Sequence, residues 1–362
     1  MEKKLLNFQA DRIELVLAAH KAPARVWGGR MTARTIQFHL APASNTKLNR
    51  LEALTEEVAL ALGVRSARLT RSDGLLSLEV PRTDSQFVSL NDLAQKLQRD
   101  EGLRRAVSVP GTAILGLDVE GVPLLLRLSS PDVAHCLIAG TTGSGKTELA
   151  RTIIASLTLY QKPRDLQLAL FDPKHHGLAP FANLPQLLFP IVSEVNETMD
   201  RLGYLVSEME RRDRDASTDA QRITRPRIVI VVDELADVIE TGGAAIESVL
   251  TRLVQRGRSA GVSLIACTQK PTARAVGTLM KANFPVRLVG RVASAEDARV
   301  AAGIGGTGAE KLAGRGDFLL VAGGQIIRFQ VARASVEEIA RSASERSGVE
   351  RTGIFGRLRR VK

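Results

Sequence analysis

The sequence predicts an α/β protein in which a small α+β domain precedes a larger domain with a mostly parallel sheet. Two observations support the parallel sheet. From about residue 129, short apolar segments of strand length alternate with longer segments of helical periodicity, which is typical of strands joined by helical connections. A glycine-rich turn at 140–147 also follows an apolar segment directly and precedes a helical one, so strand, turn and helix are consecutive.

Residues 1–128 are predicted to form the small α+β domain. Alternating polar and apolar residues indicate strands, and apolar residues at helical spacing indicate helices. The expected elements are a helix at 5–17, a strand at 34–40, a helix at 48–62 that ends at Gly63, strands at 66–70 and 75–80, and a hairpin at 111–128. No catalytic constellation occurs here, so docking or nucleic-acid contact is the expected role. Trp27 fits a core or interface anchor better than a base-stacking side chain.

The turn at 140–147 reads GTTGSGKT and matches the pattern G-x-x-x-x-G-K-[ST] without a mismatch. Glycines let backbone amides close around a phosphate group, and the N-terminus of the following helix adds its positive dipole. Lys146 is expected to reach the β- and γ-phosphates of ATP, and the Thr147 hydroxyl to ligate Mg²⁺. The residues expected to bind the nucleotide are Gly140, Thr141, Thr142, Gly143, Ser144, Gly145, Lys146, Thr147 and Glu148.

A second motif follows the aliphatic run at 228–232, where two acidic residues come directly after a predicted buried strand. Asp233 is expected to hold Mg²⁺, and Glu234 to polarise the attacking water as general base. The pair lies 87 positions after Lys146, with a full strand between them, as a Walker B motif does. A third strand at 262–268 ends in Gln269, which is expected to report the state of the γ-phosphate as a sensor residue.

The rest of the second half supplies further predicted elements. The glycine-rich run at 303–308 is not a second phosphate loop, because no Lys-Ser/Thr pair follows it. The other expected elements are a helix with a solvated face at 194–222, strands at 285–291, 317–321 and 326–331, and a final region at 335–362 with a helix near 336–344 and a basic tail at 351–362.

Composition limits the classes of protein. The chain has 50 Lys and Arg against 39 Asp and Glu, a net charge of +11, which favours a polyanionic partner, although a basic solubilising surface has the same composition. Cys136 and Cys267, the two cysteines, both fall in predicted buried strands, so no disulfide framework or metal-binding cysteine pattern is expected. No run of 18 apolar residues occurs. We therefore expect a protein of the cytoplasm without a membrane segment.

The motifs, in this order, resemble the motor domain of the FtsK/SpoIIIE family of DNA translocases. The resemblance is clear over about 110–340 and weaker before it, where the family places a small α+β domain. It is carried by the segments AHCLIAGTTGSGKT, FDPK, EMERR, IVIVVDELAD, LTRLVQRGRSAGVSLIACTQKP, KANFPVRL, SAEDAR, GAEKLAGRGDFLL and SVEEI.

The resemblance implies a RecA-like ATPase that assembles as a homo-oligomeric ring, usually a hexamer, around double-stranded DNA and binds ATP between subunits. Lys146, Thr147, Asp233, Glu234 and Gln269 then take the roles given above. A neighbouring subunit must also supply an arginine to the γ-phosphate. The candidates are Arg258, Arg287 and Arg299, with Arg287 preferred.

Two loops are expected to face DNA in such a ring, one at 240–243 after the Walker B motif and one at 270–281 after Gln269. Arg274, Lys281 and Arg315 are the residues expected to contact backbone phosphates, in a salt-dependent way.

The sequence also departs from the family pattern. The membrane-spanning N-terminal part and the C-terminal winged-helix module that reads DNA polarity are missing, which indicates either a shortened chain or a naturally short member. The opening Met favours the short member. Alternative functions are a related ring ATPase that moves protein substrates and a nucleotide-gated scaffold. Measuring ATPase activity with and without duplex DNA separates these alternatives.

Overall fold

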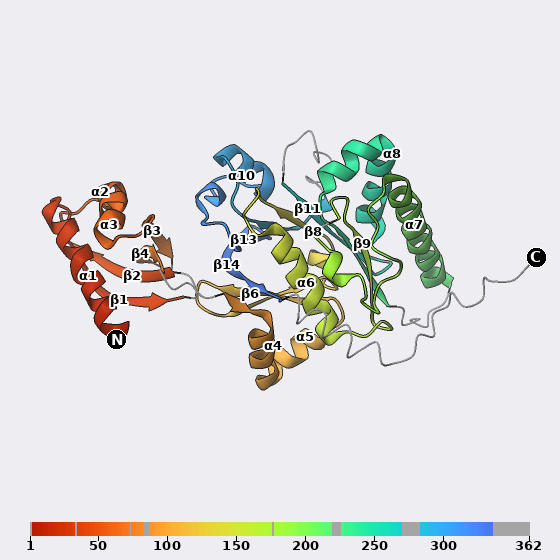
Figure 1. Cartoon of the computed structure of the whole chain (residues 1–362), viewed down its shortest axis with the longest axis horizontal. Coiled ribbons are helices and arrows are strands. Elements are labelled where there is room, and N and C mark those ends of the chain that lie inside the picture. Colours follow the sequence, from red (N-terminus) through yellow and green to blue (C-terminus); the bar gives the residue numbers. More distant parts are fainter. Residues whose placement is uncertain are drawn as a thin grey trace, which may run out of the picture. The chain divides into compact units, whose positions relative to one another are not determined.

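The computed structural model of the chain describes residues 2–32, 35–72, 74–82, 87–175, 177–218, 226–269 and 283–335. Its internal contacts divide the chain into two compact units, Met1–Phe87 and Val88–Lys362. Figure 1 shows the elements of both units, coloured along the sequence. The division lies before the predicted boundary at residue 128, and the sheet of the second unit explains the difference.

The first unit combines an antiparallel sheet, with strand order β1-β2-β4-β3, and helices that pack on it. Ile13, Phe38, Leu51 and Leu78 lie at the centre of its core, each at most 3% exposed. The elements are α1 (Glu2–Ala19), β1 (Ala24–Met31), β2 (Thr35–Pro42), α2 (Leu48–Ala53), α3 (Thr55–Leu62), β3 (Arg68–Ser72) and β4 (Leu75–Pro81).

The local structure of this unit agrees only in part with the elements predicted from the sequence. Gly63 ends α3 in the left-handed conformation, with φ 67°, as a glycine C-cap does. The predicted helix at 48–62 is two helices, because Leu54 leaves the helical region with φ −95° and ψ 7°. Trp27 lies on β1, a strand that was not predicted, and its side chain is 56% exposed with its ring 5.2 Å from that of His39. The expectation of a core position for Trp27 is therefore wrong, and its alternative as an interface anchor stays a prediction.

The second unit begins with a short strand, two helices and a hairpin, and then alternates strands with helices. Its elements are β5 (Val88–Ser89), α4 (Leu90–Arg99), α5 (Glu101–Ser108), β6 (Thr112–Asp118), β7 (Pro123–Arg127), η1 (Pro131–Val133), β8 (Cys136–Ala139), α6 (Lys146–Tyr160), β9 (Leu166–Phe171), η2 (Ala179–Phe181), α7 (Val195–Thr218), β10 (Arg227–Val232), α8 (Leu235–Arg256), β11 (Val262–Thr268), β12 (Val286–Val289), α10 (Ala295–Ala302), η3 (Ala309–Lys311), β13 (Asp317–Ala322) and β14 (Gln325–Arg333).

These strands form one mixed sheet with the order β7-β6-β14-β13-β12-β8-β11-β10-β9, and β5 pairs with β14. The strands β12, β8, β11, β10 and β9 run parallel to one another. The pairings from β12 through β13, β14 and β6 to β7 are antiparallel. The prediction of a mostly parallel sheet therefore describes only one half of the sheet.

Two of the antiparallel pairings, β13 with β14 and β6 with β7, are hairpins. Gly323 and Gly324 join β13 to β14, and both have positive φ, which suits a two-residue hairpin turn. The hairpin predicted at 111–128 is confirmed as β6 and β7, but Asp118 of β6 pairs with Phe329 of β14. The hairpin thus extends the large sheet and belongs to the second unit, which moves the division away from residue 128.

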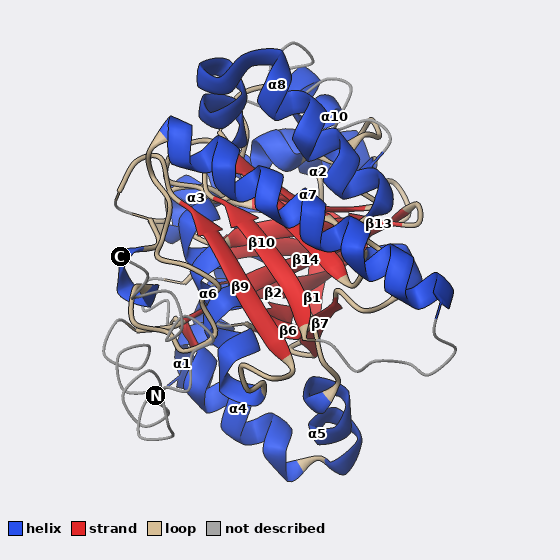
Figure 2. Cartoon of the chain, turned by 90° about the vertical axis from the view of Figure 1, so that its right-hand side faces the viewer, coloured by secondary structure: helices blue, strands red, loops and turns tan. Residues whose placement is uncertain are grey.

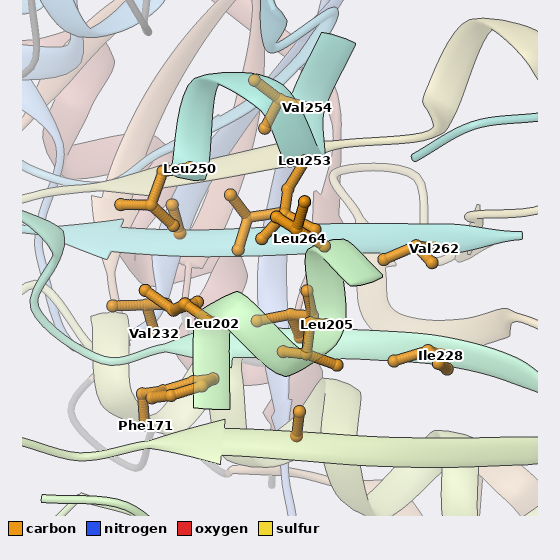
Figure 3. Close-up of a cluster of buried hydrophobic side chains, with 14 of the residues drawn as sticks. Phe171, Leu202, Leu205, Ile228, Val232, Leu250, Leu253, Val254, Val262 and Leu264 are labelled. Atoms are coloured by element: carbon orange, nitrogen blue, oxygen red, sulfur yellow. The ribbon is translucent and has the colours of Figure 1, made fainter. Parts of the chain in front are cut away.

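A large apolar core covers one face of the parallel half. In Figure 2, α7 lies across β9 and β10. Figure 3 shows Leu202 and Leu205 of α7 beside Phe171 of β9 and Ile228 of β10. In the same view, Leu253 of α8 lies next to β11. All residues of β10 from Ile228 to Val232 are buried, although successive side chains point to opposite faces of the sheet. That strand is therefore covered on both faces, as parallel strands are. This core fixes the strand ends that carry the polar residues described below.

Within the residues that the structure describes, no helix combines the length and the apolar character needed to cross a bilayer.

Candidate nucleotide site

The predicted phosphate loop lies between β8, which ends at Ala139, and α6, which begins at Lys146. The parallel strands next to β8 end at the same edge of the sheet, and the residues that follow β9, β10 and β11 are Asp172, Asp233 and Gln269. The carboxyl edge of parallel strands is where α/β sheets bind ligands. The fold therefore brings the three predicted motifs to one place.

Glycines are required at two positions of this loop for steric reasons. Gly145 has φ 100°, and a Cβ there would lie 2.6 Å from the backbone nitrogen of Gly316. A Cβ at Gly140 would lie 2.6 Å from Oγ of Ser144. That hydroxyl is buried and has no hydrogen-bond partner among the described residues. A phosphate oxygen would satisfy it.

Backbone hydrogen bonds with residues next to β12 and β13 hold the loop. The nitrogens of Arg315 and Gly316 donate to the carbonyl oxygens of Gly143 and Ser144 at 2.9 and 2.7 Å. The nitrogen of Thr141 donates to the carbonyl oxygen of Arg291 at 2.9 Å. Arg315 therefore lies beside the phosphate loop, with an exposed side chain and φ 52°. Its contact with DNA stays a prediction, and the other two predicted contacts, Arg274 and Lys281, lie outside the described residues.

Lys146 is buried and turned toward the end of β10. Its Nζ donates to the carbonyl oxygen of Asp233 at 2.9 Å and lies 3.4 Å from Oε2 of Glu234. Its side chain is 5% exposed. Because a flexible lysine can exchange a carboxylate for a phosphate, this position is consistent with the predicted role at the β- and γ-phosphates.

Two buried carboxylates, Asp172 and Asp233, each have one oxygen, Oδ1, without a hydrogen-bond partner among the described residues. Burial raises the pKa of Asp233, the charge of Lys146 opposes the shift, and the charge of Asp172 adds to it. A cation at this place would offset the cost of burying the two charged carboxylates, so the residues fit a divalent ion. No cluster of three or more His, Cys, Asp or Glu that could hold a metal occurs in the described part of the chain. Thr147, the second predicted Mg²⁺ ligand, lies in the first turn of α6.

Glu234 is 2% exposed and is held from three directions. Its Oε1 accepts from the backbone nitrogen of Gln269 at 3.0 Å. Its Oε2 lies 3.4 Å from Nζ of Lys146 and 3.4 Å from Nζ of Lys174. The candidate general base therefore has a fixed orientation, with a backbone donor at Oε1 and two cations at Oε2.

Gln269 connects the phosphate loop with Glu234. Besides its backbone bond to Glu234, its side-chain Oε1 accepts from the hydroxyl of Thr142 at 3.0 Å. A residue at the tip of the strand beside the Walker B strand thus contacts both motifs, and its role as a sensor of the γ-phosphate stays a prediction.

The preferred trans arginine, Arg287, is in the wrong place for that role. Its side chain is 9% exposed, and its guanidinium donates to the carbonyl oxygens of Val300 and Ala301, both at 3.3 Å. Burial lowers the pKa of Arg287. An arginine in an apolar strand is equally compatible with an anchor for a neighbouring helix, and here it anchors α10 of its own chain.

The other two arginine candidates are both exposed. Arg299 forms a salt bridge with Glu296 on α10, with Nε 3.0 Å from Oε2. Arg258 follows α8, and its side chain forms no ion pair or hydrogen bond with the described residues. Glu148, which was predicted to bind the nucleotide, instead faces cations of its own chain, with Oε1 3.1 Å from Arg151 and Oε2 3.4 Å from Arg333.

The residues between β9 and η2 contribute contacts that the sequence did not predict. Nε of Arg151 donates to the carbonyl oxygen of Gly177 at 2.7 Å. A Cβ at Gly177 would lie 2.4 Å from Oδ2 of Asp233. Oδ2 of Asp172 accepts from the nitrogen of Leu178 at 2.8 Å. The segment FDPK, a strand followed by an acid and a lysine, is the signal that would have directed attention to this loop and to Lys174.

Comparisons with solved structures agree with this fold. The conjugation coupling protein TcpA of pCW3, solved as a monomer with ATPγS, has a TM-score of 0.63 at 18% identity, covering 93% of this chain and 99% of that one. The cytoplasmic domain of the type VII secretion ATPase EccC from Thermomonospora curvata has a TM-score of 0.59 at 23% identity, covering 72% of this chain and 34% of that one. These likenesses concern the P-loop ATPase fold.

Curated relatives are more similar in sequence. The DNA translocase FtsK of Halalkalibacterium halodurans is 32% identical over 364 aligned residues, covering 94% of this chain and 45% of the relative. The DNA translocase SftA of Bacillus subtilis is 31% identical, covering 96% of this chain and 38% of the relative. This chain thus spans less than half the length of either relative. The FtsK alpha domain model matches residues 1–82, and the FtsK/SpoIIIE family model matches residues 96–223. The chain belongs to the FtsK/SpoIIIE family.

Proposed function

We propose that this chain is an ATP-hydrolysing motor that binds and translocates double-stranded DNA. The observation that carries the proposal is the joint placement of Lys146, Glu234 and Gln269 at the carboxyl edge of the sheet. The relatives named above as DNA translocases support the choice of DNA as the substrate.

Each residue of the site has a separate task in hydrolysis. Lys146 moves from Asp233 and Glu234 to the β- and γ-phosphates. Glu234 then accepts a proton from water at Oε2, because Oε1 already accepts from Gln269. When the phosphate loop responds to the γ-phosphate, a shift of Thr142 reaches Glu234 through Gln269, which contacts both residues. Thr147 and Asp233 would hold Mg²⁺, which neutralises the charge on the phosphate oxygens.

A RecA-like core is supported by the parallel strands, whose order is β12-β8-β11-β10-β9 with the phosphate loop after the strand β8. A ring, with six subunits as the expected number, would place an arginine of one subunit at the γ-phosphate of its neighbour. Arg258 is the candidate that we now propose, because Arg287 is buried in its own subunit and Arg299 is paired with Glu296.

The proposed DNA contacts follow the Walker B and sensor motifs. The segment predicted as a loop at 240–243 instead lies within α8, which is kinked at Gly243 with φ 61° and ψ −157°. The predicted loop at 270–281 lies outside the described residues. Arg315 remains a candidate for phosphate contact. The net charge of +11 supports a polyanionic partner, and we place the protein in the cytoplasm.

The test is the ATPase rate of the purified chain with and without duplex DNA at low and moderate salt. Stimulation by DNA that weakens as salt rises supports the motor, because phosphate contacts release counterions. A rate that DNA does not change at either salt concentration contradicts it and favours a scaffold or a motor that moves protein.

A further inference from the structure

Lys174 connects the candidate general base with the helix that follows it. Its Nζ lies 3.4 Å from Oε2 of Glu234 and 3.0 Å from Oδ2 of Asp237. Glu234 immediately precedes α8, and Asp237 lies in the first turn of that helix. Burial opposes the charge of Lys174, but its hydrogen bonds and the charges of Asp237 and Glu234 raise its pKa above the usual value. Lys174 is therefore a cation at neutral pH.

The backbone near Lys174 is anchored on both sides. The nitrogen of Asp172 donates to the carbonyl oxygen of Val192 at 2.8 Å, and Oδ2 of Asp172 accepts from the nitrogen of Leu178 at 2.8 Å. Arg151 of α6 binds the carbonyl oxygen of Gly177. A lysine on an anchored segment loses less conformational freedom when it pairs with a carboxylate.

Binding of ATP changes the surroundings of Glu234. In this structure Lys146 and Lys174 both approach Oε2 of Glu234, each at 3.4 Å. The phosphates require Lys146, which then leaves the carboxylate. Among the described residues, Lys174 is then the side-chain cation that still pairs with Glu234. A buried carboxylate without a cation would be costly. Its Oε1 would still accept from the backbone nitrogen of Gln269, but Oε2 would lose both of its lysine partners if Lys174 were also absent.

We propose that Lys174 is a positioning residue that holds the carboxylate of Glu234 toward the attacking water after Lys146 has moved to the phosphates. This inference rests on the proposed ATPase activity. It predicts an effect on turnover and not on nucleotide binding, because Lys174 pairs with Glu234 and Asp237 and not with the phosphate loop. Asp237 contributes by keeping the lysine over Glu234.

The experiment compares Lys174→Met, Lys174→Arg and the control Lys162→Met in the full chain with duplex DNA. Lys162 is exposed and follows α6, so its replacement makes the same change of charge away from the site. We expect Lys174→Met to lower kcat by roughly tenfold, a fraction of the 10²- to 10⁴-fold that general base catalysis typically contributes. The dissociation constant of a nonhydrolysable ATP analogue should change by less than about twofold. Arginine should restore most of kcat, and the control should match the wild type.

A double-mutant cycle with Glu234→Gln tests whether Lys174 acts through Glu234. If it does, Lys174→Met changes the residual rate of Glu234→Gln by less than about twofold, because the group that it positions is already disabled. A tenfold loss that persists in that background overturns the inference, as does a parallel loss of nucleotide affinity or a failure of arginine to restore turnover. If the wild type hydrolyses ATP and Lys174→Met is equally active, only this inference fails. If the wild type hydrolyses no ATP, the proposed function fails first.

Discussion

The backbone nitrogen of Gln269 donates a hydrogen bond of 3.0 Å to Oε1 of Glu234. The side chain of the same glutamine accepts from the hydroxyl of Thr142 in the phosphate loop. The backbone bond does not depend on the type of side chain, whereas the contact with Thr142 does. One residue therefore holds the candidate base and contacts the loop that surrounds the phosphates.

The first prediction separates these two contacts. Gln269→Ala keeps the backbone bond to Glu234 and removes the contact with Thr142. We expect nucleotide binding to stay within about twofold of the wild type, while ATPase activity falls by roughly tenfold, since a positioned polar group is lost. Measuring analogue affinity and steady-state turnover side by side checks this. An unchanged rate would show that the side chain of Gln269 has no sensor role.

Replacement of Lys146 is the second prediction. Lys146→Ala removes the lysine expected to bind the phosphates, so we expect nucleotide binding and ATPase activity to be lost together. Titration with a fluorescent ATP analogue measures the binding. Lys162→Ala serves as the control because Lys162 is exposed and follows the C-terminal end of α6, whereas the phosphate loop precedes the N-terminal end. ATP hydrolysis retained by Lys146→Ala would refute the assignment of the phosphate site.

The third prediction concerns Glu234. Glu234→Gln keeps the shape of the side chain and its bond from the nitrogen of Gln269, but an amide cannot accept the proton of water. ATP binding should survive, and turnover should fall by about 10²- to 10⁴-fold. Single-turnover hydrolysis measures the chemical step. Turnover near the wild-type rate would place the general base elsewhere.

Replacement of Arg258 and replacement of Arg287 are predicted to impair different properties of the protein, activity in one case and stability in the other. Arg258→Ala should abolish ATPase activity with unchanged stability, because its exposed side chain would act on a neighbouring subunit. Arg287→Ala should lower the free energy of unfolding by about 1–3 kcal/mol, because buried carbonyl oxygens of α10 lose their donor.

Mixing subunits tests the trans role of Arg258. Lys146→Ala subunits carry an intact Arg258, and Arg258→Ala subunits carry an intact phosphate loop. Two inactive variants should therefore regain part of the activity when mixed in one ring. No recovery across all mixing ratios, with assembly shown by sedimentation, would exclude Arg258 as the trans arginine.

The sequence predicted the parallel strands of the site well, for a local reason. The strands predicted at 228–232 and 262–268 match β10 and β11 to within one residue, because both segments are mostly apolar and are followed by polar residues. The meeting of Lys146, Glu234 and Gln269 also followed from local patterns, since parallel strands end at a common edge.

Features that depend on long-range pairing were not predictable in the same way. The antiparallel half depends on the register of β14 with β6, between segments more than 200 positions apart, and no local pattern encodes that register. The pairing of Lys174 with Glu234 depends on the path of a loop. Arg287 is a charged residue in an apolar strand, and the sequence alone did not distinguish a buried anchor from a residue that serves a neighbouring subunit.

The last prediction concerns stability at mildly acidic pH, through His135. This side chain is 3% exposed, and its Nδ1 accepts from the nitrogen of Leu264 at 3.0 Å. Burial lowers the pKa of His135 from 6.5 to about 4, against a smaller opposing effect of a hydrogen bond with the backbone of Val254. The unfolded chain therefore takes up a proton between pH 6.5 and 4 that the folded chain does not.

Because the unfolded chain binds this proton more readily, lowering the pH favours unfolding. His135 has little effect on the free energy of unfolding above pH 6.5, and it lowers that free energy progressively as the pH falls toward 4. At pH 5 the loss relative to pH 7.5 is about 2 kcal/mol, at about 1.4 kcal/mol for each unit. In His135→Asn, the oxygen Oδ1 replaces Nδ1 as the acceptor for Leu264 and does not titrate. Urea unfolding of both proteins at pH 7.5 and pH 5, followed by circular dichroism, should show a smaller loss in the variant. An equal loss in both would mean that His135 is protonated in the folded protein.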